Sequence, residues 1–149
     1  MVVVDINVLV YAADEDSPLH TACRDWLERQ RAAADAWYAS WPIFYEFLRV
    51  TTHPRVMRRP WNLSEAWQFV TALIASPGLD ILVPTPRHAE VAGQVVAELP
   101  HLAGNLLHDA HTAILMREHG IRRICTRDSD FHRFTFLEVV DPLQQPPGR

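Results

Sequence analysis

The sequence contains no lysine, so all fourteen of its basic residues are arginine. This absence excludes a P-loop lysine, Schiff-base chemistry and a lysine general base. Arginine is instead well suited to two-pronged contacts with phosphate groups. The formal net charge of −4 argues against a nucleic-acid-binding protein, whose surface is commonly basic. Acidic residues gathered around a metal ion would change that balance, because the cation would offset their charge.

Cysteine and long apolar runs are also scarce. Cys23 and Cys125 are the only cysteines, and both lie within apolar patterns, so we expect buried, reduced thiols. No run approaches the roughly 20 apolar residues of a membrane span. The opening Met-Val-Val-Val-Asp has no basic region or small-residue cleavage site, which indicates a strand and not a signal peptide. We therefore expect a soluble, cytoplasmic protein with a single domain over residues 1–149.

Short apolar runs alternate with amphipathic helical patterns along the chain. Strands are predicted at 2–4, 37–40, 81–83, 123–126 and 137–140, and helices are predicted to begin near Ser17, Pro42, Asn62, Thr85 and Leu106. The clearest start signal is Asn62 with Glu65 three residues later, which resembles a capping box. Alternating strands and helices are typical of βαβ units. The predicted fold is therefore a three-layer α/β domain with a mainly parallel five-stranded sheet.

Acidic residues follow the predicted strands, at the edge where ligands of parallel sheets bind. Asp5 directly follows the first strand, and Asp128 and Asp130 follow the fourth. Asp109 lies in the first turn of the helix that leads into the fourth strand. Taken alone, any one of these acids could simply cap a turn or a helix, or favour the helix dipole.

Glu46 is harder to explain as an ordinary surface residue. It lies on the helix after the second strand, whose apolar residues nearly encircle it, so the pattern predicts that much of Glu46 is buried. A buried carboxylate without a partner is costly. The alternative is a surface ion pair with Arg49, three residues later.

The joint placement of these acids is more informative than any one of them. Carboxylates from four chain segments would meet near one sheet edge, repel one another and raise one another's pKa values. A divalent cation would neutralise such a cluster, and ligands that are all oxygens favour Mg²⁺ or Mn²⁺ over zinc. Because Mg²⁺ commonly shares its site with substrate phosphates, the pattern favours metal-assisted attack on a phosphodiester.

Four stretches of the sequence resemble the PIN-domain ribonucleases, in particular the VapC-type toxins of prokaryotic toxin–antitoxin modules. These stretches are Val-Asp-Ile-Asn-Val-Leu (4–9), Tyr-Glu-Phe-Leu-Arg-Val-Thr-Thr (45–52), Leu-His-Asp-Ala-His-Thr-Ala (107–113) and Thr-Arg-Asp-Ser-Asp-Phe (126–131). The first stretch alone is weakly specific, but the four in this order run through almost the whole chain.

The resemblance implies a Rossmann-like sheet, Mg²⁺-dependent endoribonuclease activity on an RNA substrate and neutralisation by a cognate VapB-type antitoxin. It also implies a homodimer, to which Trp26 and Trp67 could contribute. The acidic residues that carry over as catalytic and metal-binding are Asp5, Glu46, Asp109 and Asp128, with Asp130 as a fifth metal ligand. Asn7 and Thr126 match polar positions that commonly support the site.

Three alternatives remain open at this point. His108-Asp109 would suit an HD-type phosphohydrolase, but that class uses a helical scaffold with further ligands. A HAD-type phosphotransferase needs a second aspartate where this chain has Asn7. A catalytically silent PIN scaffold would bind RNA or protein without cleaving, although it would have no reason to keep a repulsive acidic cluster.

A basic and aromatic loop is a further candidate for RNA contact. It consists of Arg55, Arg58, Arg59 and Trp61. Such a loop could hold a phosphate backbone or stack a base. A solvated loop with Trp61 packed against the next helix explains the same pattern equally well.

Overall fold

Five parallel strands form one sheet in the order β3-β2-β1-β4-β5. The computed structural model of the chain describes residues 1–144. The strands are β1 (Val2–Val4), β2 (Trp37–Ser40), β3 (Leu79–Leu82), β4 (Arg123–Cys125) and β5 (Glu138–Val140). The buried strand β1 lies between β2 and β4, where the strand order changes direction. The predicted Rossmann-like sheet is confirmed, and its switch point lies beside β1, where ligands of such sheets bind.

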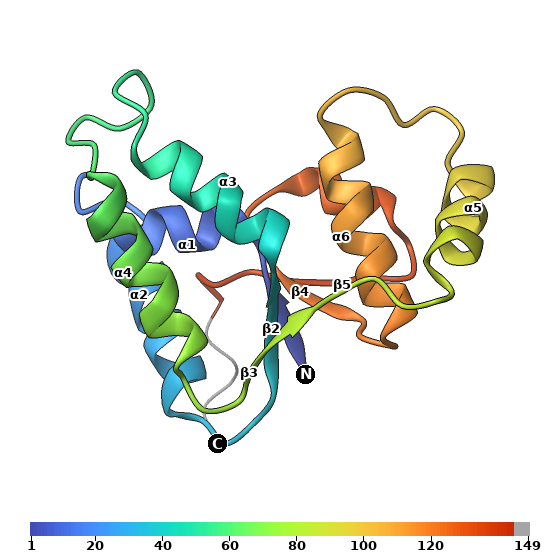
Figure 1. Cartoon of the computed structure of the whole chain (residues 1–149), viewed down its shortest axis with the longest axis horizontal. Coiled ribbons are helices and arrows are strands. Elements are labelled where there is room, and N and C mark those ends of the chain that lie inside the picture. Colours follow the sequence, from blue (N-terminus) through green and yellow to red (C-terminus); the bar gives the residue numbers. More distant parts are fainter. Residues whose placement is uncertain (145–149) are drawn as a thin grey trace.

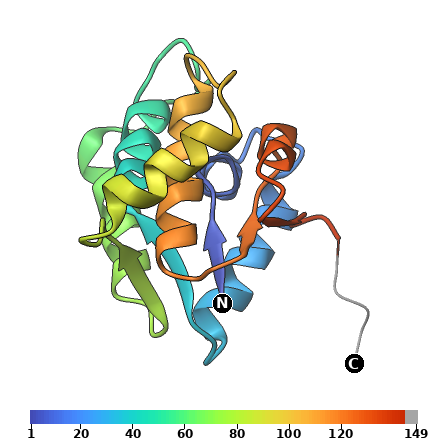
Figure 2. The ribbon, with the colours of Figure 1, turned by 90° about the vertical axis from the view of Figure 1, so that its right-hand side faces the viewer.

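Within residues 1–144, six α-helices and one short 3₁₀ helix surround the sheet. They are α1 (Ile6–Ala13), α2 (His20–Ala32), α3 (Trp41–Thr51), α4 (Leu63–Ile74), α5 (His88–Glu98), α6 (Leu106–Glu118) and η1 (Ser129–Arg133). Helices α1 to α4 lie on one side of the sheet and α5 and α6 on the other (Figures 1 and 2). This division is expected for right-handed crossovers, because the chain reverses its direction across the sheet after β3.

The core consists of strand residues and the inward faces of the helices. Its largest fully buried side chains include Trp37, Phe44 and Phe47. Cys23 and Cys125 are buried and unpaired, as predicted. Among residues 1–144, no helix combines the length and apolar character needed to cross a bilayer.

Helix α1, which directly follows β1, was not predicted from the sequence. Residues 6–13 are mostly apolar, so they show no helical alternation of apolar and polar faces and resemble a continued strand. Helix α2 begins at His20 and not at Ser17, because Ser17 instead accepts a hydrogen bond from the backbone of Leu19 in a turn before the helix. The predicted capping box of Asn62 and Glu65 is confirmed.

Candidate active site

Asp5 lies where β1 ends and α1 begins, at the centre of the carboxyl edge of the sheet. It caps α1, because its Oδ1 accepts a hydrogen bond of 2.8 Å from the backbone N–H of Ile6. Only 3% of the residue is exposed. Burial raises the pKa of Asp5 to about 6, although hydrogen bonds from Thr126 and Ile6 act in the opposite direction. The carboxylate is therefore fixed in place, and burial makes its charged form energetically unfavourable.

A polar network joins Asp5 to the loop that follows β4. The Thr126 hydroxyl donates to Asp5 Oδ2 at 2.7 Å, and Asn7 Nδ2 donates to both of them, at 3.1 Å to Asp5 Oδ2 and 3.0 Å to Thr126 Oγ1. Thr126 Oγ1 also accepts from the backbone N–H of Asp128 at 2.9 Å. The backbone N–H of Arg127 donates to Asn7 Oδ1 at 3.1 Å. The network therefore ties the start of α1 to the segment that carries Asp128, as the sequence resemblance implied for Asn7 and Thr126.

Three further aspartates converge beside this network. Asp109, Asp128 and Asp130 each offer a carboxylate oxygen, and these oxygens lie within 4.8 Å of one another. Asp128 caps η1 by accepting from the backbone N–H of Asp130 at 2.9 Å. Burial and then the charges of Asp128, Asp5 and Asp130 raise the pKa of Asp109 to about 7. A hard divalent cation fits this set, because all of its donors are oxygens and its charges repel one another.

Glu46 lies outside the group of three aspartates. Its two oxygens accept from Arg49, with 3.0 Å between Arg49 Nε and Glu46 Oε2 and a second, shorter contact between Nη2 and Oε1. This pairing lowers the pKa of Glu46, and the nearby charge of His108 acts in the same direction. The Glu46 side chain is 41% exposed, so the prediction that it is largely buried is wrong. The apolar face of α3 turns inward on Ile43, Phe44 and Phe47, while Glu46 and Arg49 lie on its open edge.

Comparison with known proteins gives this arrangement a family. The profile of the PIN domain matches residues 2–137. The chain belongs to the PIN-domain family. Ribonuclease VapC48 of Mycobacterium tuberculosis is 32% identical over 143 residues, which cover 93% of this chain and 95% of that protein. Ribonuclease VapC37 of the same species is 34% identical over 148 residues, which cover 99% of each chain. Within the family, this PIN domain therefore groups with the VapC ribonucleases.

A solved structure shares the fold of this PIN domain. VapBC2 from Rickettsia felis, solved with a DNA fragment from its promoter, has a TM-score of 0.69 at 15% identity and covers 95% of this chain and 98% of its own. PIN-domain ribonucleases are metal-dependent in general, which agrees with the acidic cluster of Asp109, Asp128 and Asp130. An HD-type hydrolase is excluded by the parallel sheet, and a HAD-type phosphotransferase is excluded by the family match over 2–137.

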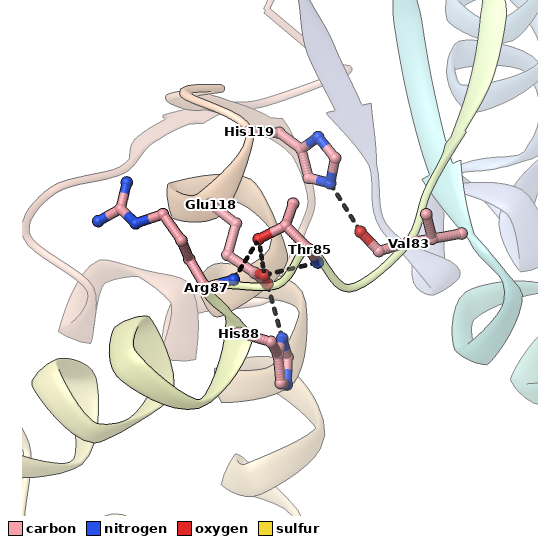
Figure 3. A network of polar contacts seen from close by, with 6 residues as sticks. All are labelled: Val83, Thr85, Arg87, His88, Glu118 and His119. Carbon is pink, nitrogen blue, oxygen red and sulfur yellow. Dashed lines mark hydrogen bonds and ion pairs between the residues drawn. The ribbon is translucent and has the colours of Figure 1, made fainter.

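A second polar network of this PIN domain was not predicted from the sequence (Figure 3). The wholly buried side chain of Glu118, at the end of α6, accepts from the Thr85 backbone N–H at 2.9 Å and the Thr85 hydroxyl at 2.8 Å, and it contacts His88 Nδ1 at 2.6 Å. Burial opposes ionisation of Glu118, but the hydrogen bonds from His88 and Thr85 lower its pKa overall. His119 Nε2 donates to the carbonyl of Val83 at 2.7 Å. These contacts fasten the loop after β3 to α6, the helix that carries Asp109.

In the basic and aromatic loop, Trp61 packs edge-to-face against Phe47 and Phe69, with ring centroids 6.2 Å and 5.7 Å away. Arg59 pairs with Asp16, at 3.0 Å between Nε and Oδ2. The alternative, in which Trp61 packs against the next helix, is confirmed.

Proposed function

We propose that this PIN domain is the toxin of a VapBC-type module and hydrolyses RNA at the carboxyl edge of β1 and β4. The observation that carries the proposal is the convergence of four aspartates from three chain segments at this edge. A fold gains no stability from gathering like charges, so their retention favours a functional reason. The relatives named ribonucleases support RNA as the substrate and the phosphodiester as the bond that is cleaved.

Asp109, Asp128 and Asp130 would hold Mg²⁺ or Mn²⁺ together with Asp5. When bound there, the ion supplies a Lewis acid that activates water for attack and offsets negative charge on the scissile phosphate. Thr126 and Asn7 keep the Asp5 carboxylate in one orientation through their hydrogen bonds. Such preorganisation avoids the cost of reorientation during the reaction.

Glu46 would complete the catalytic set from the opposite side of this site. Its carboxylate is engaged by Arg49 and is near His108, which lies next to Asp109 on α6. Glu46 would therefore join the site only after Arg49 releases one or both of its oxygens. Exposed ion pairs contribute little free energy, so this exchange is energetically accessible.

The proposed partner besides RNA is a cognate VapB-type antitoxin. An arginine of its C-terminal segment would fork onto site carboxylates, as Arg49 already does on Glu46. Glu46 and Asp128 would be the anchors for this arginine, and among residues 1–144 Asp128 has no arginine partner, whereas Glu46 has one. Asp128 would therefore be the stronger anchor. An RNA substrate and such a partner also favour action in the cytoplasm.

A homodimer is proposed from the resemblance, and the two tryptophans suggested for its interface differ in exposure. Trp26 is buried, so it cannot contribute to an interface, whereas Trp67 remains exposed on α4. The dimer surface would therefore include Trp67 and not Trp26. Sedimentation of the protein and of Trp67→Ala would test this proposal.

The decisive experiment is cleavage of total cellular RNA with Mg²⁺, with EDTA and by the variant Asp128→Asn. Asparagine keeps the side-chain shape and can still accept from the Asp130 N–H, so the fold and thermal midpoint should persist while cleavage is lost. Asp35→Asn, in the exposed loop between α2 and β2, is the matched control. Full activity of Asp128→Asn would remove this residue from the mechanism. Absence of Mg²⁺-dependent cleavage by the unmodified protein would favour the silent scaffold.

A further inference from the structure

The acids of the site differ in whether they have an arginine partner. Glu46 is paired with Arg49 and Asp130 with Arg133, each three residues later in the chain. In the part of the chain that the structure describes, Asp5, Asp109 and Asp128 have no arginine within ion-pair distance. The negative charges of these three aspartates are therefore not compensated by arginine, whereas Glu46 and Asp130 each pair with a guanidinium group.

The two arginines approach the site from different elements. Arg49 lies on α3 and Arg133 at the end of η1, and these two elements lie on opposite sides of α1 (Figure 2), the helix that Asp5 caps. Their side chains are 61% and 57% exposed. Arg133 Nε is 3.7 Å from Asp130 Oδ1, which is beyond hydrogen-bond distance. Arg133 therefore donates no hydrogen bond to Asp130, and Arg49, which uses Nε and Nη2 on Glu46, keeps the donors of Nη1 for an incoming ligand.

We propose that Arg49 and Arg133 bind RNA phosphates on the two sides of the scissile phosphate, and so position the strand over the aspartates. This inference rests on the proposed ribonuclease function. A protein with a net charge of −4 and no lysine must supply the cationic contacts for a polyanion locally, from arginine. Arg133 pairs with Asp130, whose carboxylate lies within 4.8 Å of those of Asp109 and Asp128, and Arg49 pairs with Glu46 on α3. Both carboxylate pairs are exposed enough to exchange for phosphate.

The same geometry allows a simpler role, in which each arginine only neutralises its own acid. The two roles differ in what happens when the acid is removed as well. If Arg49 acts only on Glu46, then Glu46→Gln combined with Arg49→Gln restores the local charge and should restore RNA binding. If Arg49 contacts phosphate, the double variant still lacks that contact, and binding stays weak.

The test measures the salt dependence of binding. Fluorescence anisotropy of a labelled single-stranded RNA is recorded with Mg²⁺ against NaCl concentration, with every protein in the Asp128→Asn background to prevent cleavage. Each phosphate contact to a single strand contributes about 0.7 to the slope of log affinity against log salt. Arg49→Gln with Arg133→Gln should therefore reduce the slope by about 1.4. Arg24→Gln on α2, whose side chain is 53% exposed and paired with Asp25, is the matched control and should leave the slope unchanged.

Steady-state cleavage by the corresponding variants without Asp128→Asn provides the second measurement. Loss of Arg49 or Arg133 should raise KM more than it lowers kcat, because the contact is made in the bound substrate as well as in the transition state. Slopes and KM values equal to those of Arg24→Gln would overturn the inference while leaving the ribonuclease proposal intact. If adding Glu46→Gln to Arg49→Gln restores the slope, the proposed role of Arg49 in binding phosphate is overturned. Absence of cleavage by the unmodified protein is a failure of the proposed function, and the anisotropy slopes still decide this inference.

Discussion

Replacing Asp109 by asparagine should stabilise the metal-free protein at alkaline pH, although it removes a proposed metal ligand. The pKa of Asp109 is about 7 in the folded protein, against an ordinary value of 3.8, so the folded state holds a proton that the unfolded chain has already released. Stability therefore falls as pH rises between these two values, and the full penalty applies above about pH 7. Asparagine cannot ionise, so the variant should escape this penalty.

The expected size of the effect follows from that difference. About three pH units separate the two values, which corresponds to at most about 4 kcal/mol at about 1.36 kcal/mol per unit. Asp109 is only partly buried, so solvent screening reduces the expected gain to about 2 kcal/mol. A small favourable interaction with the dipole of α6 is lost as well. For a domain of this size the thermal midpoint should rise by about 4–8 °C.

Thermal melting in EDTA at pH 8 and at pH 5 measures this effect, with Asp35→Asn as the control for loss of an exposed charge. The gain of Asp109→Asn should be full at pH 8 and only about two-fifths as large at pH 5, because pH 5 lies only about one unit above the ordinary value of 3.8, where the penalty begins. Saturating Mg²⁺ should then stabilise the unmodified protein more than the variant, because binding to the folded state shifts unfolding by mass action. An equal midpoint of variant and unmodified protein at pH 8, or an equal gain at both pH values, would refute the reasoning.

Three other predictions concern the surroundings of the site. Thr126→Val removes a hydrogen bond that lowers the pKa of Asp5, so the acidic limb of the pH–rate profile should move to higher pH and the free energy of unfolding should fall by about 1–2 kcal/mol. Thr126→Ser keeps the hydroxyl and should restore both properties. An acidic limb that does not move in Thr126→Val would contradict the role of the hydroxyl. Glu118→Gln weakens the contact with His88 and should lower the free energy of unfolding by about 1–3 kcal/mol, while RNA cleavage is retained. Glu90→Gln, at an exposed position, is the control and should change neither property. Loss of cleavage by Glu118→Gln well below its melting temperature would instead show a direct role of Glu118 in cleavage. In the antitoxin, arginine-to-alanine changes in the C-terminal segment should abolish protection of cells and inhibition of RNA cleavage; if every such variant still inhibits at equal concentration, occupation of the acidic site is not the mechanism.

Most of the fold was predictable because its signals are local. Each strand is a short apolar run, and the capping box of Asn62 and Glu65 depends on residues three positions apart. Helix α1 was missed because it is short and apolar on nearly all sides, so periodicity could not separate it from β1. The N-cap Asp5 was the one available signal, but an aspartate after a strand can cap a turn as well as a helix, so it did not by itself predict α1.

The aspartates of the site were predictable for a topological reason. Residues that directly follow parallel strands must lie at one edge of the sheet, so Asp5 and Asp128 are brought together by strand order alone. The partners of charged side chains depend on packing and are not encoded locally in the same way. Glu118 and Thr85 are separated by more than thirty positions, and their contact depends on how α5 and its preceding loop pack against α6. No pattern in the sequence indicated that network.

The distribution of charge around the site separates what stabilises the fold from what serves its function. Most acids of the described chain that lie near arginine form exposed ion pairs, and Glu118 is buried with a full set of partners. Asp5 and Asp109 depart from this pattern, because burial and like charges raise the pKa values of both. A group that is destabilised in this way is maintained only if something other than folding requires it. Binding of the proposed cation would relieve the penalty directly, and the energy that these aspartates cost the metal-free fold would become part of the affinity for the ion.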